Sequence, residues 1–290
     1  MHAVARSGRW LWAVSGLVTA AALAVPLTRV IAEPGIALHA QPSPTVTVSR
    51  TATVPEPVTS LSVQSYGGQV RVMAGPVTRV QVTETITYDR KQGGPPAVME
   101  SVSGGRLTLA DPACDGSDCD VDFTVTVPPG LTATVVTQGG PIVASGIAAA
   151  DLDSGGGPVR ATRIGGPLTV VTGGGPLMLD GLAGPLRADT GGGDLAARDV
   201  TATAATVTTG GGMATVAFST APDSVTISTD GGPLVLTVPG GPYALTADSG
   251  GGPQQVGIAT DPIARATISA SSGGGPLQVE PPGGVIPSSQ

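Results

Sequence analysis

The stretch Pro158–Asp194 reads PVRATRIGG, PLTVVTGGG, PLMLDGLAG, PLRADTGGG and then D, which is a repeat of nine residues. Each unit opens with Pro or Asp, and most units close with two or three glycines. The second and fourth positions are apolar, and they alternate with mixed residues. They are Val159, Ala161, Leu168, Val170, Leu177, Leu179, Leu186, Ala188, Leu195 and Ala197. A period of two predicts one short strand with one buried face in each unit.

The seventh position of the unit shows that the true period is eighteen residues. It is aliphatic in alternate units, at Ile164, Leu182 and Val200, and glycine in the others, at Gly173 and Gly191. We expect the glycine runs to supply backbone conformations with positive φ at tight corners. Two short strands per period predict an all-β fold, a β-solenoid of about 18–20 residues per coil. An antiparallel meander is the alternative, but it gives no reason for corners that alternate in kind.

A polar residue stands before every glycine corner of the repeat. Ser154, Thr172, Thr190 and Thr209 are each followed by three glycines. After Val200 the register loosens, and the glycine corners recur at longer intervals before Met213, Pro233, Pro253 and Pro276. The sequence therefore predicts regular coils in the middle of the chain and less regular ones toward its end.

The N-terminal part predicts an exported protein. Residues 1–9 carry two arginines, and Trp10–Thr28 is free of charged residues and long enough to cross a bilayer as a helix. We therefore expect a cytoplasmic segment 1–9, one transmembrane helix or signal anchor over 10–32, and a Pro-rich linker over 33–57. The strand-repeat domain then covers 58–280 outside the cytoplasm, and 281–290 form a disordered tail. Cleavage as a signal peptide, after Ala22-Leu23-Ala24 or Val30-Ile31-Ala32, is the alternative and would release a secreted protein.

Composition excludes several classes of function. The chain of 290 residues has a net charge of −7 and a single lysine, Lys91, so nucleic acid is not an expected partner. The two histidines, His2 and His39, lie outside the repeat domain, which excludes Ser–His, Cys–His and His-ligated metal sites within it. No cofactor is expected.

An enzyme on this scaffold would need a carboxylate pair, or arginine with carboxylate, as in carbohydrate-active enzymes. The charged residues that could line one face are Asp151, Asp153, Arg160, Arg163, Asp180, Arg187, Asp189 and Arg198. Ordinary solvation of exposed strand positions explains the same residues. We therefore predict no catalytic residues.

An acidic loop holds both cysteines, Cys114 and Cys119. Because export places them in an oxidising compartment, we predict a disulfide between them. Its aspartates could bind Ca²⁺, through Asp115, Asp118 and Asp120. A solvated acidic loop is the simpler interpretation, since no Glu closes an EF-hand pattern.

Several of these features together resemble a known family. They are the strand Val121–Pro128, the cysteine pair upstream of it, and half-coil ends such as Ser145-Gly146-Ile147 that alternate with Thr-Gly-Gly-Gly corners. In these the chain resembles the bacterial putative-adhesin family of β-strand-repeat domains over residues 58–280. The resemblance implies an exported, often membrane-anchored domain and no catalytic residues. Where that family commonly has Ser-Gly-Asp-Val at a corner, this chain mostly has Gly-Gly-Pro-Leu.

The sequence thus favours a non-enzymatic, membrane-anchored cell-envelope protein. Its repeats would present an extended surface for adhesion or for binding an envelope polymer or protein. The alternatives are a carbohydrate-active enzyme on the same scaffold, and an accessory protein of envelope-stress signalling.

Overall fold

The computed structural model describes residues 45–92, 94–111 and 119–284, all of which belong to one compact unit, Ser43–Gln290. Strands dominate this unit, and one short 3₁₀ turn, η1 (Arg90–Gln92), is the only helical element among the described residues. The prediction of an all-β fold is therefore confirmed. Among these residues there is no helix long and apolar enough to cross a membrane, and the predicted membrane segment 10–32 lies outside them.

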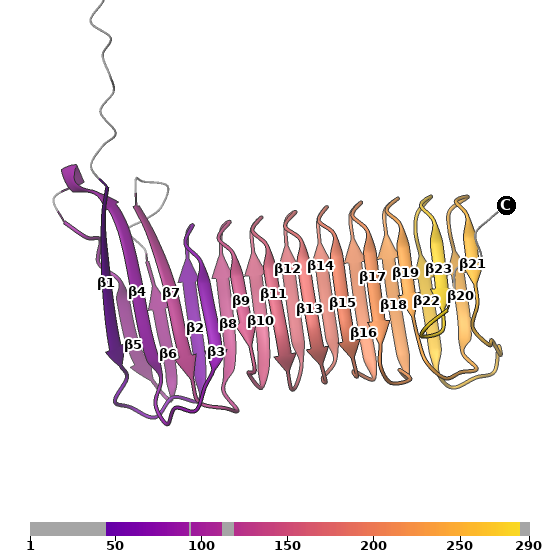
Figure 1. Cartoon of the computed structure of the whole chain (residues 1–290), viewed down its shortest axis with the longest axis horizontal. Coiled ribbons are helices and arrows are strands. Elements are labelled where there is room, and N and C mark those ends of the chain that lie inside the picture. The colour runs from indigo at the N-terminus through magenta and orange to yellow at the C-terminus, as the bar shows by residue number, and fades with distance from the viewer. Residues whose placement is uncertain (1–44, 93, 112–118, 285–290) are drawn as a thin grey trace, which may run out of the picture. The chain divides into compact units, whose positions relative to one another are not determined.

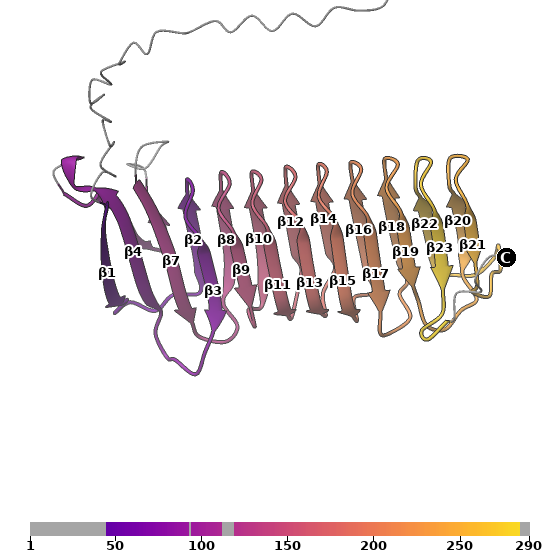
Figure 2. The same ribbon diagram turned by 45° about the horizontal axis from the view of Figure 1, so that its top comes forward.

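The strands form two sheets whose members lie in two rows (Figures 1 and 2). Sheet A has the order β1 (Thr45–Thr53), β4 (Gln81–Asp89), β7 (Cys119–Val127), β3 (Val70–Ala74), β9 (Ile142–Ser145), β11 (Val159–Ile164), β13 (Leu177–Leu182), β15 (Leu195–Val200), β17 (Ala214–Phe218), β19 (Leu234–Thr237), β23 (Leu277–Glu280) and β21 (Gln254–Val256). Sheet B has the order β20 (Ala244–Asp248), β22 (Thr267–Ser271), β18 (Ser224–Thr229), β16 (Ala204–Thr209), β14 (Leu186–Thr190), β12 (Leu168–Thr172), β10 (Ala149–Ser154), β8 (Thr132–Thr137), β2 (Ser60–Ser65), β6 (Arg106–Ala110) and β5 (Met99–Ser103).

In the nine-residue repeats the chain alternates between the two sheets, and each strand pairs in parallel with the strand two places further on. Val159 pairs with Leu177 in sheet A, and Leu168 pairs with Leu186 in sheet B, so the offset is eighteen residues. The offset grows after Val200, where Leu195 pairs with Ala214. Parallel pairing between periods rules out an antiparallel meander for the repeats. We call the two strands of one period, one from each sheet, a coil.

The core lies between the two sheets, because the apolar second and fourth positions of each unit point inward. Val159, Leu168, Val170 and Leu177 are each at most 1 % exposed. The aliphatic corner residues Ile164, Leu182 and Val200 are buried as well. The sequence pattern therefore predicts the buried face of the repeats correctly.

The glycine corners allow close approach between coils. Our expectation that their glycines have positive φ is wrong for the regular coils. Gly173, Gly174 and Gly175 do not have positive φ. A Cβ added to Gly175 would collide with the backbone carbonyl of Gly157 in the preceding coil, whereas one added to Gly174 would meet open space. Successive corners lie too close together for a side chain at the first and third glycine.

The polar residue before each corner is buried and bonds to the backbone of that corner. Thr190 donates a hydrogen bond from Oγ1 to the carbonyl of Gly193 (3.2 Å) and accepts one from the Gly193 amide (2.8 Å). Thr209 donates in the same way to the carbonyl of Gly212 (2.8 Å). These side chains satisfy backbone groups that would otherwise be buried without a partner.

Residues 45–53 correct the predicted linker 33–57, since they form strand β1. Thr and Val alternate in this segment, and β1 pairs antiparallel with β4 along its full length. Hydrogen bonds join Thr47 to Thr87 (3.1 Å) and Thr51 to Thr83 (3.0 Å) across the pair. Prolines lie on both sides of this strand, at Pro44 and Pro55, and they conceal its strand pattern in the sequence. The other predicted segment boundaries stay predictions.

At both ends of the unit the coils are not stacked in the order of the sequence. Strands β22 and β23 lie between the coil of β18 and β19 and the coil of β20 and β21. Strands β2 and β3 likewise lie between β6 and β7 on one side and β8 and β9 on the other. The last strand of the chain is therefore held between two others rather than at an edge.

Candidate functional site

The charged residues that the sequence singles out do not share one face. Asp151, Asp153, Arg187 and Asp189 lie at outward positions of sheet B, and Arg160, Asp180 and Arg198 lie at outward positions of sheet A. Arg163 stands at the aliphatic corner with a positive φ of 53°. Because the two outer faces point away from each other, the eight residues cannot form a single catalytic site.

A hollow of about 200 Å³ lies on the outer face of sheet A. Its outward-pointing side chains are Arg160 and Thr162 from β11, Met178 and Asp180 from β13, and Ala196 and Arg198 from β15. The register places Arg160 opposite Met178 and Asp180 opposite Arg198. The sequence names both arginines and the aspartate as candidates, and the structure brings these three together.

A second hollow, of about 360 Å³, lies at the aliphatic corner of the same coils. Arg163, Gly181 and Asp199 line it, and all three have positive φ, of 53°, 66° and 49°. Only glycine adopts this conformation without strain, so Arg163 and Asp199 are held there by their neighbours. Arg163 donates a hydrogen bond to Ser145 Oγ (2.8 Å), and Asp199 accepts one from Ser219 (2.7 Å).

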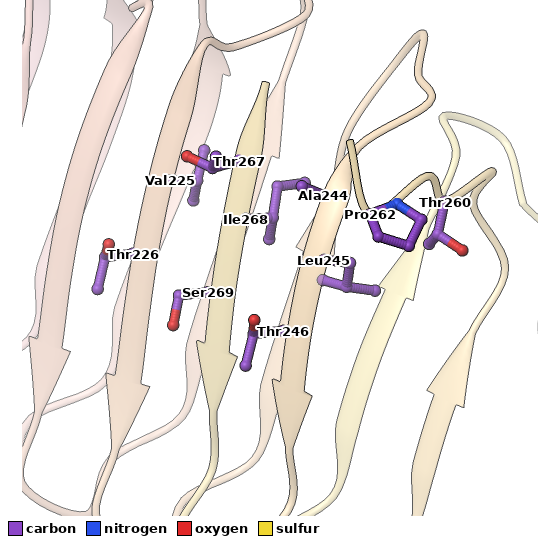
Figure 3. Close-up of a pocket in the computed structure, with 10 residues that line it drawn as sticks. All are labelled: Val225, Thr226, Ala244, Leu245, Thr246, Thr260, Pro262, Thr267, Ile268 and Ser269. Atoms are coloured by element: carbon purple, nitrogen blue, oxygen red, sulfur yellow. The ribbon is translucent and has the colours of Figure 1, made fainter. Parts of the chain in front are cut away.

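The largest of the three hollows, about 410 Å³, lies at the C-terminal end of sheet B (Figure 3). Thr226, Thr246 and Ser269 lie on neighbouring strands along its length, and Pro262 and Thr260 stand at one side of it. The backbone of Tyr243 bonds to both Ala259 and Asp261, which fixes the segment that carries Thr260 beside β20. None of its lining residues is charged.

This hollow belongs to a wider array of hydroxyl side chains, which we call the hydroxyl face. It consists of the outward Ser and Thr residues of β16, β18, β22 and β20, namely Thr206, Thr208, Ser224, Thr226, Ser228, Thr246, Thr267, Ser269 and Ser271. Thr267 bonds to Ser224 (3.5 Å), and the other seven have no bonding partner within the described part of the chain. Their hydroxyls are free to bond to a ligand. The sequence does not predict this face, because β22 adjoins β18 only in the folded chain.

None of these three hollows brings two carboxylates together. The hollow on sheet A contains Asp180 alone, the corner hollow contains Asp199 alone, and the hollow in the hydroxyl face contains neither Asp nor Glu. Hydrolysis of a glycosidic bond by the usual mechanism needs a pair of carboxyl groups on either side of that bond. These hollows lack that pair. The hollow on sheet A does contain arginine with a carboxylate, which is the second arrangement named above for a carbohydrate-active enzyme.

The acidic loop is described only in part. Asp111 is 2 % exposed and accepts hydrogen bonds from Ser65 Oγ (3.0 Å) and the Tyr66 amide (3.2 Å). Burial raises the pKa of Asp111 to about 6. Burial, followed by the charge of Asp122, also raises the pKa of Asp120. Asp111 continues the inward alternation of Leu107 and Leu109, a signal that could have revealed its burial.

The predicted disulfide and calcium site stay predictions. Cys114, Asp115 and Asp118 lie outside the described residues, so neither the pairing with Cys119 nor a shared ion with Asp120 is tested. Among the residues that the structure describes, no group of three or more His, Cys, Asp or Glu side chains is placed to hold a metal ion.

Comparisons with known proteins show similarity to solved structures alone. No family model matches the chain, and no curated protein matches it. A putative adhesin from Bacteroides fragilis is 13 % identical and covers 81 % of this chain and 97 % of its own, with a TM-score of 0.45. A putative lipid binding protein from Parabacteroides distasonis is 12 % identical, covers 81 % and 97 % of the two chains, and also has a TM-score of 0.45.

A putative adhesin from Parabacteroides distasonis is 11 % identical, covers 80 % of this chain and 97 % of its own, and has a TM-score of 0.43. All three scores lie below 0.5.

Proposed function

We propose that this chain is a non-enzymatic cell-envelope protein that is anchored to the membrane by residues 10–32. In this proposal the described unit is a β-solenoid that holds two long outer faces outside the cytoplasm, and its hydroxyl face binds components of the envelope. The parallel pairing at a fixed offset supports the solenoid. The uncharged stretch Trp10–Thr28 supports the anchor.

The hydroxyl face is the observation that carries the binding role. Adjacent strands lie about 4.8 Å apart, so the hydroxyls of four neighbouring strands form a regular array that spans roughly 14 Å. Hydroxyl groups both donate and accept hydrogen bonds, as do the groups of a sugar polymer. Neither a carboxylate pair nor a buried nucleophile is present in the hollow beneath, so the array is suited to binding rather than to cleavage.

Binding of isolated cell-envelope polymer by the full-length chain tests this proposal. Thr226→Val with Thr246→Val removes two hydroxyls from the hydroxyl face without removing bulk, and valine is well tolerated in strands. Thr215→Val with Thr237→Val makes the same change on the outer face of sheet A and is the matched control. We expect the first pair to weaken binding several-fold more than the control pair. Binding that neither pair changes, or no binding by the unaltered chain, would contradict the proposal.

A further inference from the structure

The outer face of sheet A carries a row of arginines that the hydroxyl face lacks. Arg71 on β3 pairs with Val143 on β9, which in turn pairs with Arg160 on β11. Arg198 lies on β15, two strands beyond Arg160 in the same sheet. Figure 1 shows these strands side by side. The three arginines therefore lie on every second strand, roughly 10 Å apart across the sheet at the usual strand spacing. Arg198 is displaced from Arg160 by two residues along the strand, because it pairs with Asp180 and not with Met178.

The two arginines of the hollow on sheet A have no partner among the residues that the structure describes. Neither Arg160 nor Arg198 forms an ion pair or hydrogen bond with any residue that the structure describes. Arg71 bonds to the Gln69 side chain (3.1 Å), which is neutral. Arg163 reaches from the corner to Ser145, which also bonds to Thr162 of the hollow (2.9 Å). Positive charge on this face is thus left available to a ligand.

From β3 to β15 this face carries more positive than negative charge although the protein is acidic, with a net charge of −7, and on β7 beyond β3 it carries Asp120 and Asp122. At outward positions from β3 to β15, sheet A has Arg71, Arg160 and Arg198 against Asp180 alone. The corner residues Arg163 and Asp199 offset each other. The opposite positions of sheet B, from β8 to β14, have the reverse balance, with Asp151, Asp153 and Asp189 against Arg187 alone. Charge complementarity therefore directs an anionic ligand to sheet A.

We propose that the arginine row binds the carboxylate groups of a linear acidic polysaccharide that lies across the strands of sheet A. The guanidinium group matches a planar carboxylate through two parallel hydrogen bonds. Between Arg160 and Arg198, Met178 is 51 % exposed and gives an apolar floor for the carbon face of a sugar ring. Cations repeated on every second strand suit a polymer with repeated charges better than a single small anion. This inference rests on the proposed envelope-binding function, and it adds a second binding face to that function.

The test is the affinity of the full-length chain for polygalacturonate, with dextran as the neutral polymer and polyphosphate as a polyanion without carboxylates. We expect polygalacturonate to bind, more weakly as salt is added, with little binding of dextran. Because bonds to charged groups contribute about 1.5–3 kcal/mol, Arg160→Gln with Arg198→Gln is expected to weaken binding about tenfold or more. Arg187→Gln, the matched change on sheet B, is expected to leave the affinity within about twofold.

Asp180→Asn gives a test in the opposite direction. Its carboxylate repels an anionic ligand in the hollow, so its removal is expected to tighten binding of polygalacturonate about two- to fivefold. The proposal is overturned if Arg187→Gln weakens binding as much as the double change, or if polyphosphate or dextran binds as well as polygalacturonate. Binding of envelope polymer without any dependence on Arg160 and Arg198 would overturn this inference and leave the proposed function standing. A chain that binds no envelope polymer would contradict the proposed function itself.

Discussion

At the scale of single residues, the buried polar groups are hydroxyls and two carboxylates, Asp89 and Asp111, and burial raises the pKa of Asp111. The buried Ser and Thr residues before the glycine corners bond to the backbone they cover, and they carry no charge. Asp111 is equally buried and also accepts hydrogen bonds, but its ionised form loses the solvation of water. Its hydrogen bonds only partly offset this loss, which is why its pKa is raised.

Asp111 makes stability depend on pH in a direction that can be tested. Its pKa rises from 3.8 in the unfolded chain to about 6 in the folded one, so the folded state binds more protons between these values. Stability therefore falls as pH rises from about 4 to 6. Asp111→Asn stays neutral and can keep a bond to the Tyr66 amide, so we expect a smaller fall. Burial also raises the pKa values of Asp120 and Glu84, so part of the pH dependence of stability remains in this variant.

Denaturant unfolding at pH 4.5, 6 and 7.5 measures this dependence. Asp151→Asn, at an exposed position of sheet B, is the control and is expected to change the slope little. An unaltered slope in Asp111→Asn would show that the buried carboxyl is not the group responsible.

At the scale of elements, the glycine corners limit how closely the coils can stack. The corner glycines are not equivalent, because only the first and third lie against the corner of the preceding coil. In the nine-residue repeats the middle glycine, such as Gly174, faces open space and does not have positive φ, so such a corner contains two constrained positions and one free one. The corners at 250–252 and 273–275 differ, since their middle glycines Gly251 and Gly274 have positive φ of 99° and 123°.

Two neighbouring substitutions separate the constrained position from the free one. Gly175→Ala pushes a methyl group into the Gly157 carbonyl, so we expect it to lower the free energy of unfolding by about 1–3 kcal/mol or more. Gly174→Ala is expected to change it by no more than about 0.5 kcal/mol, or to stabilise slightly, since alanine restricts the unfolded chain. Thermal and denaturant unfolding of both variants gives the comparison. Equal losses at the two positions would contradict the account of the corners.

At the scale of the whole unit, the order of the coils joins segments that are distant in sequence. The insertion of β22 between β18 and β20 completes the hydroxyl face, and the placement of β3 beside β9 brings Arg71 into the arginine row. Both surfaces depend on coils that are out of sequence order. The order of the coils therefore determines the two proposed binding faces as well as the fold.

Disulfide formation between introduced cysteines can test this order. Ser228 pairs directly with Ser271 on β22, and Asp248 pairs with Ser271 on the other side. We expect Ser228→Cys with Ser271→Cys to form a disulfide, because adjacent strands bring the Cα atoms to about 5 Å. Ser228→Cys with Asp248→Cys lies at twice that spacing and is expected to form none. Peptide mapping identifies the linked cysteines, and the reverse result would show coils stacked in sequence order.

The alternation of apolar residues predicts the buried face of the repeats, and the alternating corners predict the period of eighteen. The end coils could not be predicted in the same way. β20 and β22 have the same inward pattern, with Leu245 and Ala247 in one and Ile268 and Ala270 in the other, so either would fit beside β18. Arg160, Asp180 and Arg198 could be named from their charge. Their separation from Asp151 and Arg187 follows from the eighteen-residue period, because alternate nine-residue units lie in different sheets. The prediction of one shared face for all eight residues did not take this into account.

The central claim is that this protein binds envelope polymer and does not cleave it. The most direct measurement incubates the full-length chain with isolated envelope polysaccharide and follows bound protein and newly released reducing ends in the same sample. We expect saturable binding and no release of reducing ends above the level without protein. Release of reducing ends in proportion to protein concentration, or the absence of saturable binding, would contradict the claim.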